Sequence, residues 1–514
     1  MKVLSIGTDR KIFEEGSAVR ERAIKYGKLF DELHMVVFST RIMNYESRIK
    51  ISENVFVYPT NSRNKLLYIS DAFKISKPII HNSDPIIQDL VISAQDPFET
   101  GIVGLLLKLR YGLSLQIQLH TDFANKYFII HSFLNFLRFP LGLFVLSFAD
   151  SVRVVSNRIK RSINSLSHNI VVLPIYTHIN ELRIKNYELS KNSEIIKFLT
   201  VARLEKEKDL ETAIKAFALA DLDVEDPERS RRTVFTIVGD GSERESLELL
   251  AKSLEIEHKV KFVGWQSDLT EFYQNADIYI STSLYEGYGM SVVEAASYGL
   301  PLVLSDAGVA GDFFKDKEEA LICKQKDVNG FAQAMSLLLP DLVLRKNMGQ
   351  KAKEAVSKYK ISYSEYLEKY KNLMKQAQDF HNLNYGLFKK NILLRYLVAG
   401  IIAASTNIGL LYIFTDIFKI WYLYSSLLSF VIAVVLSFIL QKFWTFNDRE
   451  TEKVHHQFGR FLGVAILGIG INTVCMYILV DILSIWYIFA QIITGAIIAI
   501  FNFLMYKFFI FRQK

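Results

Sequence analysis

Cysteine is scarce in this 514-residue chain, which holds only Cys323 and Cys475. The two residues lie far apart, and neither belongs to a CxxC pair or to a cluster of cysteine and histidine. This distribution excludes a disulfide framework and a structural zinc site, and it is typical of a reducing compartment. The first residues, MKVLSIGTDR, become charged too soon for a secretory signal peptide, so we expect none.

The chain also lacks a concentrated run of charge of one sign. Its 61 Lys and Arg residues alternate with 54 Asp and Glu residues over most of the length, which leaves a net charge of +7. Such mixing disfavours the basic stripe of a nucleic-acid-binding protein, so we expect no nucleic-acid partner. The length exceeds one ordinary core and predicts about three domains.

Charged residues are missing from four long apolar stretches near the C-terminus. Each stretch is about 20 residues or more, the length that a helix needs to cross ~30 Å of hydrocarbon. We therefore expect four membrane spans, at about 396–415, 420–441, 461–480 and 484–506.

The membrane region contains an internal repeat with a spacing of 65 residues. Polar and aromatic residues recur at this spacing in seven pairs: Arg395 and Arg460, Asn407 and Asn472, Tyr412 and Tyr477, Asp416 and Asp481, Trp421 and Trp486, Lys442 and Lys507, Phe446 and Phe511. Each unit would be a two-helix hairpin, so the two hairpins would share one orientation as a parallel duplication.

Basic residues gather at one set of span ends. They are Arg395, Lys442, Arg449, Lys453, Arg460, Lys507, Arg512 and Lys514, whereas the opposite turns carry Asp416, Asp481 and only Lys419. The positive-inside rule then predicts that both termini, and the domain before the spans, are cytoplasmic. We expect a multi-pass protein of the cytoplasmic (inner) membrane.

Strands and helices alternate over the part of the chain before the spans. Strands are expected at 2–7, 34–38, 80–82, 90–93, 115–119 and 151–155, and a second series at 195–201, 233–238, 259–262, 276–280 and 302–304. Helices are expected at 18–33, 210–219, 242–254, 290–297 and 362–378. This alternation predicts an α/β fold with two Rossmann-like domains facing a cleft. The expected domains are 1–178, 179–378, a linker at 379–392 and a membrane domain at 393–514.

The stretch 284–301, LYEGYGMSVVEAASYGLP, combines a strand exit, a glycine-bearing turn and a helix start. Such a combination presents free backbone N–H groups to an anion. Glu286, in the turn, could accept hydrogen bonds from sugar hydroxyls. Glu294 has an alternative structural role, because Ser291 and Glu294 together fit a capping box.

Arg203 and Lys208 follow the strand at 195–201, where α/β sheets bind ligands, and they could stabilise a leaving diphosphate. The alternative is a solvated charge run, since acidic residues surround them. His120 ends an apolar strand and could point into the cleft, although a lone histidine is more often structural.

Two further motifs carry little weight. Gly239 and Gly241 in VGDGS lack the complete glycine pattern of a dinucleotide site. Asp221 and Asp223 form a D-x-D sequence, but they lie in an acidic stretch that favours a solvated loop over a metal site.

In the membrane region, Asn407 and Asn472 lie in the middle of spans, where an unpaired amide is costly. They could join the two repeats by hydrogen bonds or contact a polar group that enters the bilayer. The basic residues Arg395, Lys442, Arg460 and Lys507 could bind lipid phosphate, or they could only set the topology.

Glu286 to Glu294 resembles the E-x7-E motif of family 4 retaining GT-B glycosyltransferases. The resemblance extends from Met1 to about Gln376 and includes Gly16, the stretch DPFETG at 96–101, His120, Arg203, Lys208, VGDG at 238–241 and FVGW at 262–265. It differs in the N-terminal loop, where Glu15-Gly16-Ser17 carries one glycine instead of the family's usual pair.

This resemblance implies a role for each matching residue. Arg203 and Lys208 would hold the donor diphosphate, and Glu294 the nucleotide ribose. Glu286 would contact the donor sugar and phosphate, and His120 would line the reaction centre from the N-terminal domain. The remaining donor contacts would come from Gly16, Gly239, Gly264, Gly289, Met290 and Ser291. Members of the family generally need no metal, so we expect no metal and no cofactor beyond the nucleotide-sugar substrate.

Residues from about 393 to 512 resemble the GtrA-like family of four-span membrane proteins, which is linked to polyprenyl-phosphate sugars. The fusion implies a retaining glycosyltransferase that uses a nucleoside diphosphate sugar donor and a polyprenyl-linked acceptor at the membrane. One alternative is a translocator of lipid-linked sugars that the first domains only load. Another is a membrane scaffold whose cleft has lost activity, against which the complete set of Glu286, Glu294, Arg203 and Lys208 counts.

Overall fold

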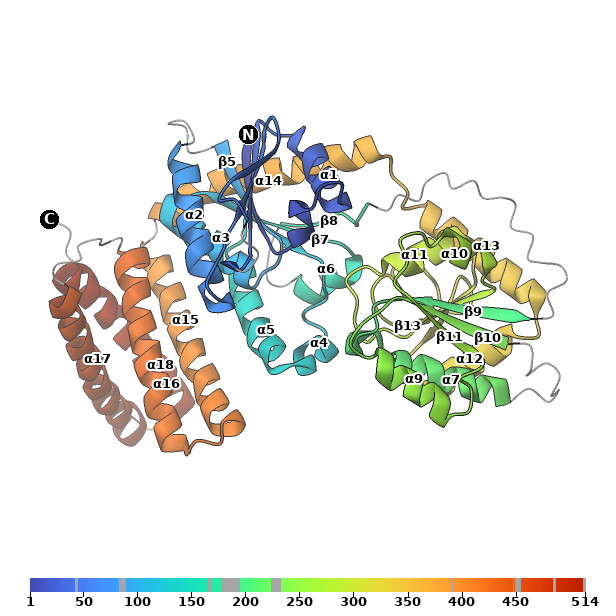
Figure 1. The fold of residues 1–514 in the computed structure, drawn as a ribbon. Helices are drawn as coiled ribbons and strands as arrows, with labels where there is room; N and C mark the ends of the chain where they lie inside the picture. The colour runs from blue at the N-terminus through green and yellow to red at the C-terminus, as the bar shows by residue number, and fades with distance from the viewer. Residues whose placement is uncertain are drawn as a thin grey trace. The chain divides into compact units, whose positions relative to one another are not determined.

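A computed structural model of the chain describes residues 1–41, 45–82, 89–164, 169–176, 195–222, 233–390, 392–446, 448, 454–483 and 487–511. The chain forms two compact units, Met1–His381 and Asn382–Lys514. The first unit contains two sheets with helices between the strands, and the described part of the second is helical (Figure 1).

The first sheet has eight strands in the order β3-β4-β2-β1-β5-β6-β7-β8. All neighbours are parallel except β3 and β4, which pair antiparallel at one edge. Its elements are β1 (Lys2–Gly7), η1 (Arg10–Phe13), α1 (Ala18–Gly27), β2 (Glu32–Val37), β3 (Ile49–Ser52), β4 (Val55–Pro59), η3 (Lys65–Leu67), α2 (Tyr68–Asn82), β5 (Leu90–Ala94), α3 (Glu99–Tyr111), β6 (Ser114–Leu119), α4 (Lys126–His131), α5 (Phe133–Leu146), β7 (Ser151–Val154), α6 (Asn157–Ile163) and β8 (Ile170–Val172).

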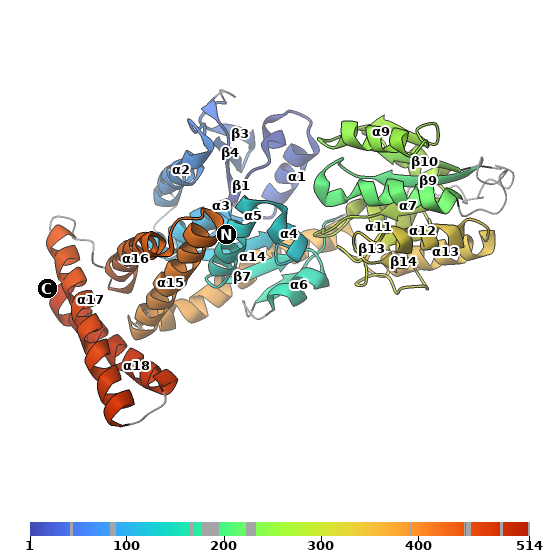
Figure 2. The same ribbon diagram turned by 90° about the horizontal axis from the view of Figure 1, so that it is seen from below.

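Helices cover both faces of this sheet (Figure 2). Leu4 and Ile6 of β1 face the core that contains α2 and α3, whereas Val3 packs in a separate core with residues of α14 (Tyr363–Lys390). Because both faces are covered, the central strands are buried throughout; all six residues of β6 are buried.

The expected strand at 80–82 is wrong, because these residues end helix α2. An apolar run of three residues has no period of its own, and the run belongs to the helical pattern that begins at Tyr68. The expected helix at 18–33 is also too long. It ends at Gly27, where an added Cβ would overlap the side chain of Val55.

The second sheet has six parallel strands in the order β11-β10-β9-β12-β13-β14. Its elements are β9 (Ile196–Val201), η5 (Lys206–Lys208), α7 (Leu210–Leu222), β10 (Thr233–Val238), α9 (Arg244–Ser253), β11 (Val260–Gly264), α10 (Thr270–Asn275), β12 (Ile278–Ser281), α11 (Met290–Ser297), β13 (Leu302–Ser305), β14 (Leu321–Cys323), α12 (Val328–Leu338) and α13 (Leu342–Ser357). Helix α14 then returns to the first sheet, and it extends past the expected end at Gln378.

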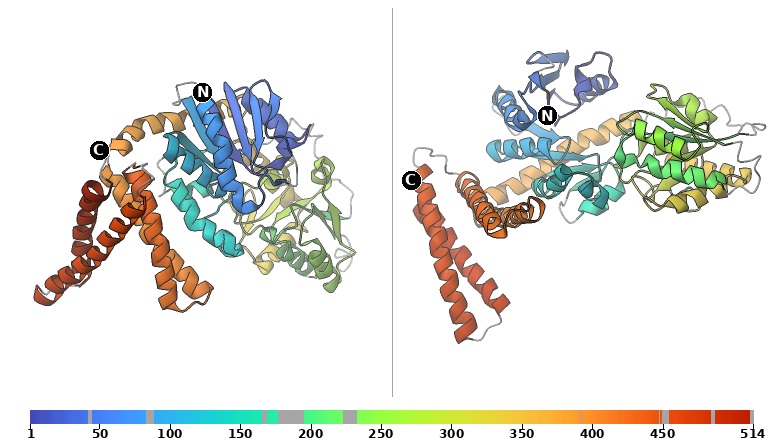
Figure 3. Two further views of the ribbon diagram at one scale, coloured as in Figure 1. Left: turned by 60° about the vertical axis from the view of Figure 1, so that its left-hand side comes forward. Right: turned by 60° about the horizontal axis from the view of Figure 1, so that its bottom comes forward.

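After the end of α14, the described residues of the second unit form four helices, each followed by a short π-helical segment. They are α15 (Ile392–Tyr412) with η6 (Ile413–Ile417), α16 (Tyr422–Ile439) with η7 (Leu440–Thr445), α17 (Val454–Tyr477) with η8 (Ile478–Ile482), and α18 (Tyr487–Met505) with η9 (Tyr506–Ile510). Helix α15 packs against α16, and α17 against α18, which are the orange and red pairs of Figure 3.

Three helices among the described residues are long and apolar enough to cross a membrane: Val398–Asp416, Leu423–Thr445 and Val454–Cys475. A fourth, Ile493–Met505, is apolar but shorter. The π-helical segments η6 and η8 begin 65 positions apart, at Ile413 and Ile478, which is the spacing of the sequence repeat.

Candidate active site in the second sheet

The loop after β12 carries Glu286 and leads directly into α11. Gly289 caps this helix in the left-handed region, with φ of 92°, a conformation that favours glycine. The first N–H groups of a helix have no partner within it, so those of Met290 and Ser291 are available to an anion. The expected helix at 290–297 is confirmed with both ends in place.

Lys208 and Glu286 form an ion pair, and both side chains are largely buried. Ser283 Oγ donates to Glu286 Oε1 at 3.0 Å. The loops that carry the pair are joined as well, because Thr282 Oγ1 donates to the Lys208 carbonyl at 2.9 Å. The structure therefore brings together two residues that the sequence separates by 78 positions.

Arg203 lies in the loop after β9, where it pairs with Glu207 at 2.8 Å and keeps most of its surface exposed. The glycine turn after β10 supports this loop. An added Cβ at Gly239 would overlap the Ala202 carbonyl, and one at Gly241 the Leu204 carbonyl. Gly264 closes the turn from the other side, because its carbonyl accepts from Gly239 N at 2.9 Å. The weak glycine motif thus has a packing role beside Arg203.

Glu294 does not cap α11, so the capping-box interpretation is wrong. The cap residue is Gly289, which has no side chain, and Ser291 lies inside the helix. Glu294 Oε2 instead accepts a hydrogen bond from the Tyr273 hydroxyl at 2.8 Å. Burial raises the pKa of Glu294 above its usual value, an effect that the tyrosine hydrogen bond opposes. No residue that the structure describes donates a hydrogen bond to the other carboxylate oxygen of Glu294.

His120 follows β6 in the first sheet, and its backbone meets the loop after β12 that carries Glu286, here called the Glu286 loop. An added Cβ at Gly287 would overlap the His120 carbonyl oxygen, so only glycine allows this approach. The His120 ring is open to a cavity enclosed by the first sheet. Desolvation within the cavity, and then the positive charges of Arg153 and Arg22, lower the pKa of His120 to about 3. The ring is therefore neutral at pH 7.

Arg158 of α6 binds a loop that follows β13. Its guanidinium pairs with Asp306 and donates to the carbonyls of Gly308, at 3.1 Å, and Ala310, at 2.6 Å. Its backbone N–H donates to Asp312 Oδ2 at 2.7 Å. An added Cβ at Gly308 would overlap the Tyr288 carbonyl and the Glu286 side chain, so the loop that Arg158 holds also packs on the Glu286 loop.

These contacts of Arg158, here called the Arg158 clasp, could not be read from the sequence, because the partners lie about 150 positions apart. Tyr273 was missed for a similar reason, since a tyrosine in a short helix has no distinctive pattern. At Gly16 an added Cβ would meet no atom within 4 Å. This glycine is exposed, has φ of 74° and precedes Ser17, the cap of α1. Asp223 of the D-x-D sequence lies outside the described residues.

In the second unit, Lys442 is fully buried. Its Nζ donates to Gln457 Oε1 at 2.6 Å and lies 3.3 Å from Asp448 Oδ1. Its repeat partner Lys507 is exposed and lies 5.9 Å from the ring centroid of Phe503. The two lysines thus occupy different environments despite their equivalent positions in the repeat.

The other candidates of the second unit differ in how far their side chains are buried. Arg395 donates to the Trp444 carbonyl at 2.8 Å, and the exposed Arg460 lies 5.2 Å from the ring centroid of Phe509. Asn407 and Asn472 are half-buried in α15 and α17.

Two family models match the chain. Residues 183–355 match "Glycosyl transferases group 1", and residues 395–511 match "GtrA/DPMS, transmembrane domain". The first match contains Arg203, Lys208, Glu286 and Glu294, whereas Gly16 and His120 lie before it.

Individual relatives resemble only part of the chain. The N-acetyl-alpha-D-glucosaminyl L-malate synthase of Bacillus anthracis is 27% identical over 198 residues, covering 37% of this chain and 50% of that protein. The N,N'-diacetylbacillosaminyl-diphospho-undecaprenol alpha-1,3-N-acetylgalactosaminyltransferase of Campylobacter jejuni is 32% identical over 147 residues, covering 28% and 38%. The chain thus spans half or less of the length of these two curated relatives.

Among solved structures, the sucrose-phosphate synthase of Thermosynechococcus elongatus superposes with a TM-score of 0.59 at 18% identity. The superposition covers 73% of this chain and 99% of that one, which shows a common fold. The chain therefore carries a glycosyl transferases group 1 domain in a GT-B fold, joined to a GtrA/DPMS transmembrane domain.

Proposed function

We propose that the protein is a membrane-anchored retaining glycosyltransferase of family 4 with an E-x7-E donor motif. It transfers a sugar from a nucleoside diphosphate sugar to polyprenyl phosphate or to a glycan on polyprenyl diphosphate. The product serves cell-surface polysaccharide or glycolipid synthesis. The observation that carries the proposal is the Lys208–Glu286 pair beside the free N–H groups of α11.

Departure of a nucleoside diphosphate creates negative charge, which cations and backbone N–H groups stabilise. In the proposal, Lys208 leaves Glu286 and binds the diphosphate, together with Arg203 and the N-terminus of α11. Glu286, released from Lys208, accepts hydrogen bonds from the donor sugar. The free oxygen of Glu294 accepts from the nucleotide ribose. The diphosphate departs from the face that the acceptor attacks, and the chemistry needs no divalent metal.

The acceptor class rests on the second domain and on one relative. A GtrA/DPMS transmembrane domain is fused to the transferase domain, and the Campylobacter jejuni relative is named for a diphospho-undecaprenol substrate. A lipid-linked acceptor explains why one chain would hold both domains.

The membrane domain in this proposal has four spans arranged as two parallel hairpins, with both termini in the cytoplasm. The three long apolar helices, the shorter helix Ile493–Met505 and the 65-residue recurrence of the π-helical segments support it. Of the basic candidates for lipid phosphate, Arg460 is exposed, whereas Lys442 is already engaged by Asp448 and Gln457.

The test uses the full chain purified in detergent. A panel of nucleoside diphosphates is screened by thermal shift, because a ligand that binds the folded state raises the apparent Tm. The matching labelled nucleotide sugars are then assayed for transfer to polyprenyl phosphate, with and without EDTA. We expect one nucleoside diphosphate to stabilise the protein and EDTA to leave transfer unchanged.

Variants assign the activity to the site. Glu294→Ala should abolish the thermal shift, whereas Lys206→Ala, a change to an exposed lysine two positions before Lys208, should preserve it. Stabilisation by none of the nucleoside diphosphates, or full transfer by Glu294→Ala, would refute the proposed function. Analysis of the anomeric configuration of the product tests retention.

A further inference from the structure

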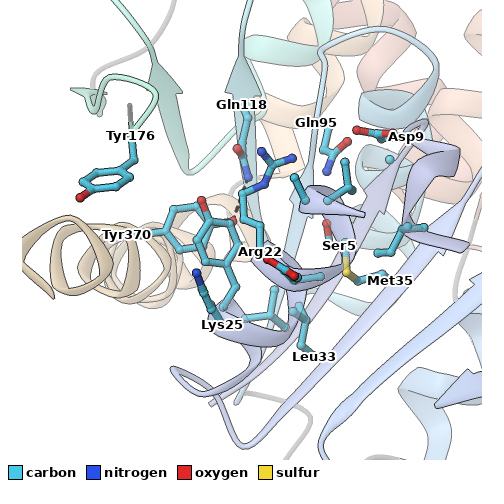
Figure 4. Close-up of a pocket in the computed structure, with 18 of the residues that line it drawn as sticks. Ser5, Asp9, Arg22, Lys25, Leu33, Met35, Gln95, Gln118, Tyr176 and Tyr370 are labelled. Carbon is cyan, nitrogen blue, oxygen red and sulfur yellow. Dashed lines mark hydrogen bonds between the residues drawn. The ribbon is translucent and has the colours of Figure 1, made fainter. Parts of the chain in front are cut away.

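A cavity of about 440 Å³ lies against the first sheet, on the face that α1 and α14 cover. Val3, Ser5 and Gly7 of β1 line it, as do Leu33 and Met35 of β2. In Figure 4, Tyr370 and Lys25 lie at one end, Asp9 and Gln95 at the other, and Gln118, Ser5 and Arg22 between them. His120 also lines the cavity, and its carbonyl oxygen lies against Gly287 of the Glu286 loop.

Tyrosines from three segments form one wall of this cavity. Tyr26 of α1 stacks on Tyr370 of α14 with ring centroids 4.5 Å apart, and its hydroxyl lies 3.2 Å from that of Tyr366. Tyr176 and Tyr363 meet beside them at 4.8 Å. Aromatic faces of this kind pack on the apolar faces of sugar rings or on hydrocarbon.

Arg153 holds the tyrosine wall in place through hydrogen bonds. Its side chain is 3% exposed, and its guanidinium donates to Gln118, to the Tyr366 hydroxyl and to the carbonyls of Leu173 and Pro174. Gln118 in turn donates to the Tyr370 hydroxyl at 3.2 Å. The positive charge of Arg153 therefore lies beside the cavity. Among the described residues, none of its hydrogen-bond acceptors is a carboxylate.

Two more cations, Arg22 and Lys25, line the cavity from α1, one turn apart. Neither forms an ion pair with any residue that the structure describes, although Lys25 lies 5.4 Å from the ring centroid of Tyr363. Like charges three positions apart on a helix destabilise it slightly. Arg153 is the third cation of the lining, whereas Asp9 and Glu21 are its two carboxylates, so the cavity has one excess positive charge that an anion would balance.

We propose that this cavity binds the phosphate of the acceptor, with Arg22 and Lys25 as its ligands and the tyrosine wall against the group that the phosphate carries. This inference rests on the proposed function and names the part of the acceptor that the first sheet recognises. Arg22 supplies paired N–H donors that match phosphate oxygens, and Lys25 adds a mobile point charge.

The same chemistry could come from a lipid phosphate or from a soluble sugar phosphate, and one titration separates them. The full chain in detergent is titrated with farnesyl phosphate, with glucose 1-phosphate, and with farnesol as the neutral control. Tighter binding of farnesyl phosphate than of the other two assigns a lipid phosphate. Equal or tighter binding of glucose 1-phosphate assigns a soluble sugar phosphate.

The double variant Arg22→Ala/Lys25→Ala should weaken binding of the preferred phosphate at least tenfold. Lys28→Ala, a change to an exposed lysine that caps the same helix, should bind as the natural protein does. Arg22→Lys/Lys25→Arg retains the charge and should recover part of the loss. The Tm of each variant, and its affinity for the nucleoside diphosphate, report whether the fold and the donor site are intact.

Unchanged phosphate binding in the double variant would overturn the inference, as would binding of farnesol as tight as that of farnesyl phosphate. Neither result would affect the proposed function if labelled sugar were still transferred. Conversely, a protein that transfers no sugar but binds phosphate through Arg22 and Lys25 would refute the function and leave the site in place.

Discussion

Two groups of cations in the first unit differ in how their charge is balanced. Lys208 and Arg203, beside the second sheet, are paired with Glu286 and Glu207. Arg22 and Lys25, beside the first sheet, have no carboxylate partner among the described residues. A paired cation is held in position before its ligand arrives, and the ligand must displace the carboxylate. An unpaired cation attracts an anion from a distance but is less well oriented.

The largest expected effect comes from removing the cation of the buried pair. Lys208→Ala should lower kcat/KM for the donor by about 100- to 1000-fold, because it removes charge stabilisation of the leaving group. It also leaves Glu286 largely buried without its cation. The measurement is steady-state transfer with the donor varied, beside Lys206→Ala. A loss under tenfold would mean that the buried pair is structural and that the comparison fails.

The next effect concerns Arg158, a cation that lies between the two sheets. Arg158→Ala removes three hydrogen bonds, one of them to a carboxylate, and should lower the free energy of unfolding by about 1.5–3 kcal/mol. Its backbone bond to Asp312 is retained. Arg161→Ala is the control, because Arg161 is largely exposed and its pair with Asp312 should contribute less than about 1 kcal/mol. Denaturant titration measures the free energy of unfolding of both variants. Equal losses would show that the Arg158 contacts contribute no more than the exposed Arg161 pair.

A smaller effect would sharpen the idea that Glu286 competes with the ligand. Glu286→Gln frees Lys208, so a nucleoside diphosphate without a sugar should bind about tenfold more tightly, or ~1.4 kcal/mol. Turnover should fall, because the donor sugar loses a carboxylate contact. Calorimetric titration of the two proteins measures the difference. Weaker binding by the variant would show that Glu286 is itself a ligand of the nucleoside diphosphate.

The smallest effect concerns Asp209, the residue after Lys208. Burial raises its pKa from an ordinary 3.8 to about 6. Since the folded state holds this proton more tightly, the carboxylate destabilises the fold as pH rises through 6, not as it falls. Asp209→Asn keeps an acceptor for Thr212, and asparagine tolerates the φ of 48°. It should raise Tm by about 2 °C at pH 8 and by almost nothing at pH 4.

The sequence predicted most of the two sheets, because their central strands are continuous apolar runs bounded by polar turns. The failures have physical causes. At 80–82 the apolar run was too short to show a helical period. The antiparallel edge strand β3 was missed because IKIS alternates weakly and is half exposed. The S-x-x-E pattern at Ser291 misled because the helix begins two residues earlier, at a glycine cap.

Within the candidate site, the sequence identified residues but not their partners. Arg203, Lys208, Glu286 and Glu294 stood out by motif and by their positions after strands. The carboxylate on Lys208 and the tyrosine on Glu294 could not be inferred, since both contacts depend on how distant segments fold. The cavity between α1 and α14 could not be predicted from the sequence either. It forms because α14, which follows the second sheet in the chain, packs against the first sheet.

The Arg158 clasp also bears on the timing of catalysis. In many enzymes the slow step is release of a product and not the chemistry. If the spent nucleotide leaves when α6 separates from the loop after β13, then the bonds of Arg158 must break together for each turnover. The residence time of that product would be set by a side chain that touches no substrate. Weakening the clasp would then speed product release while lowering the free energy of unfolding.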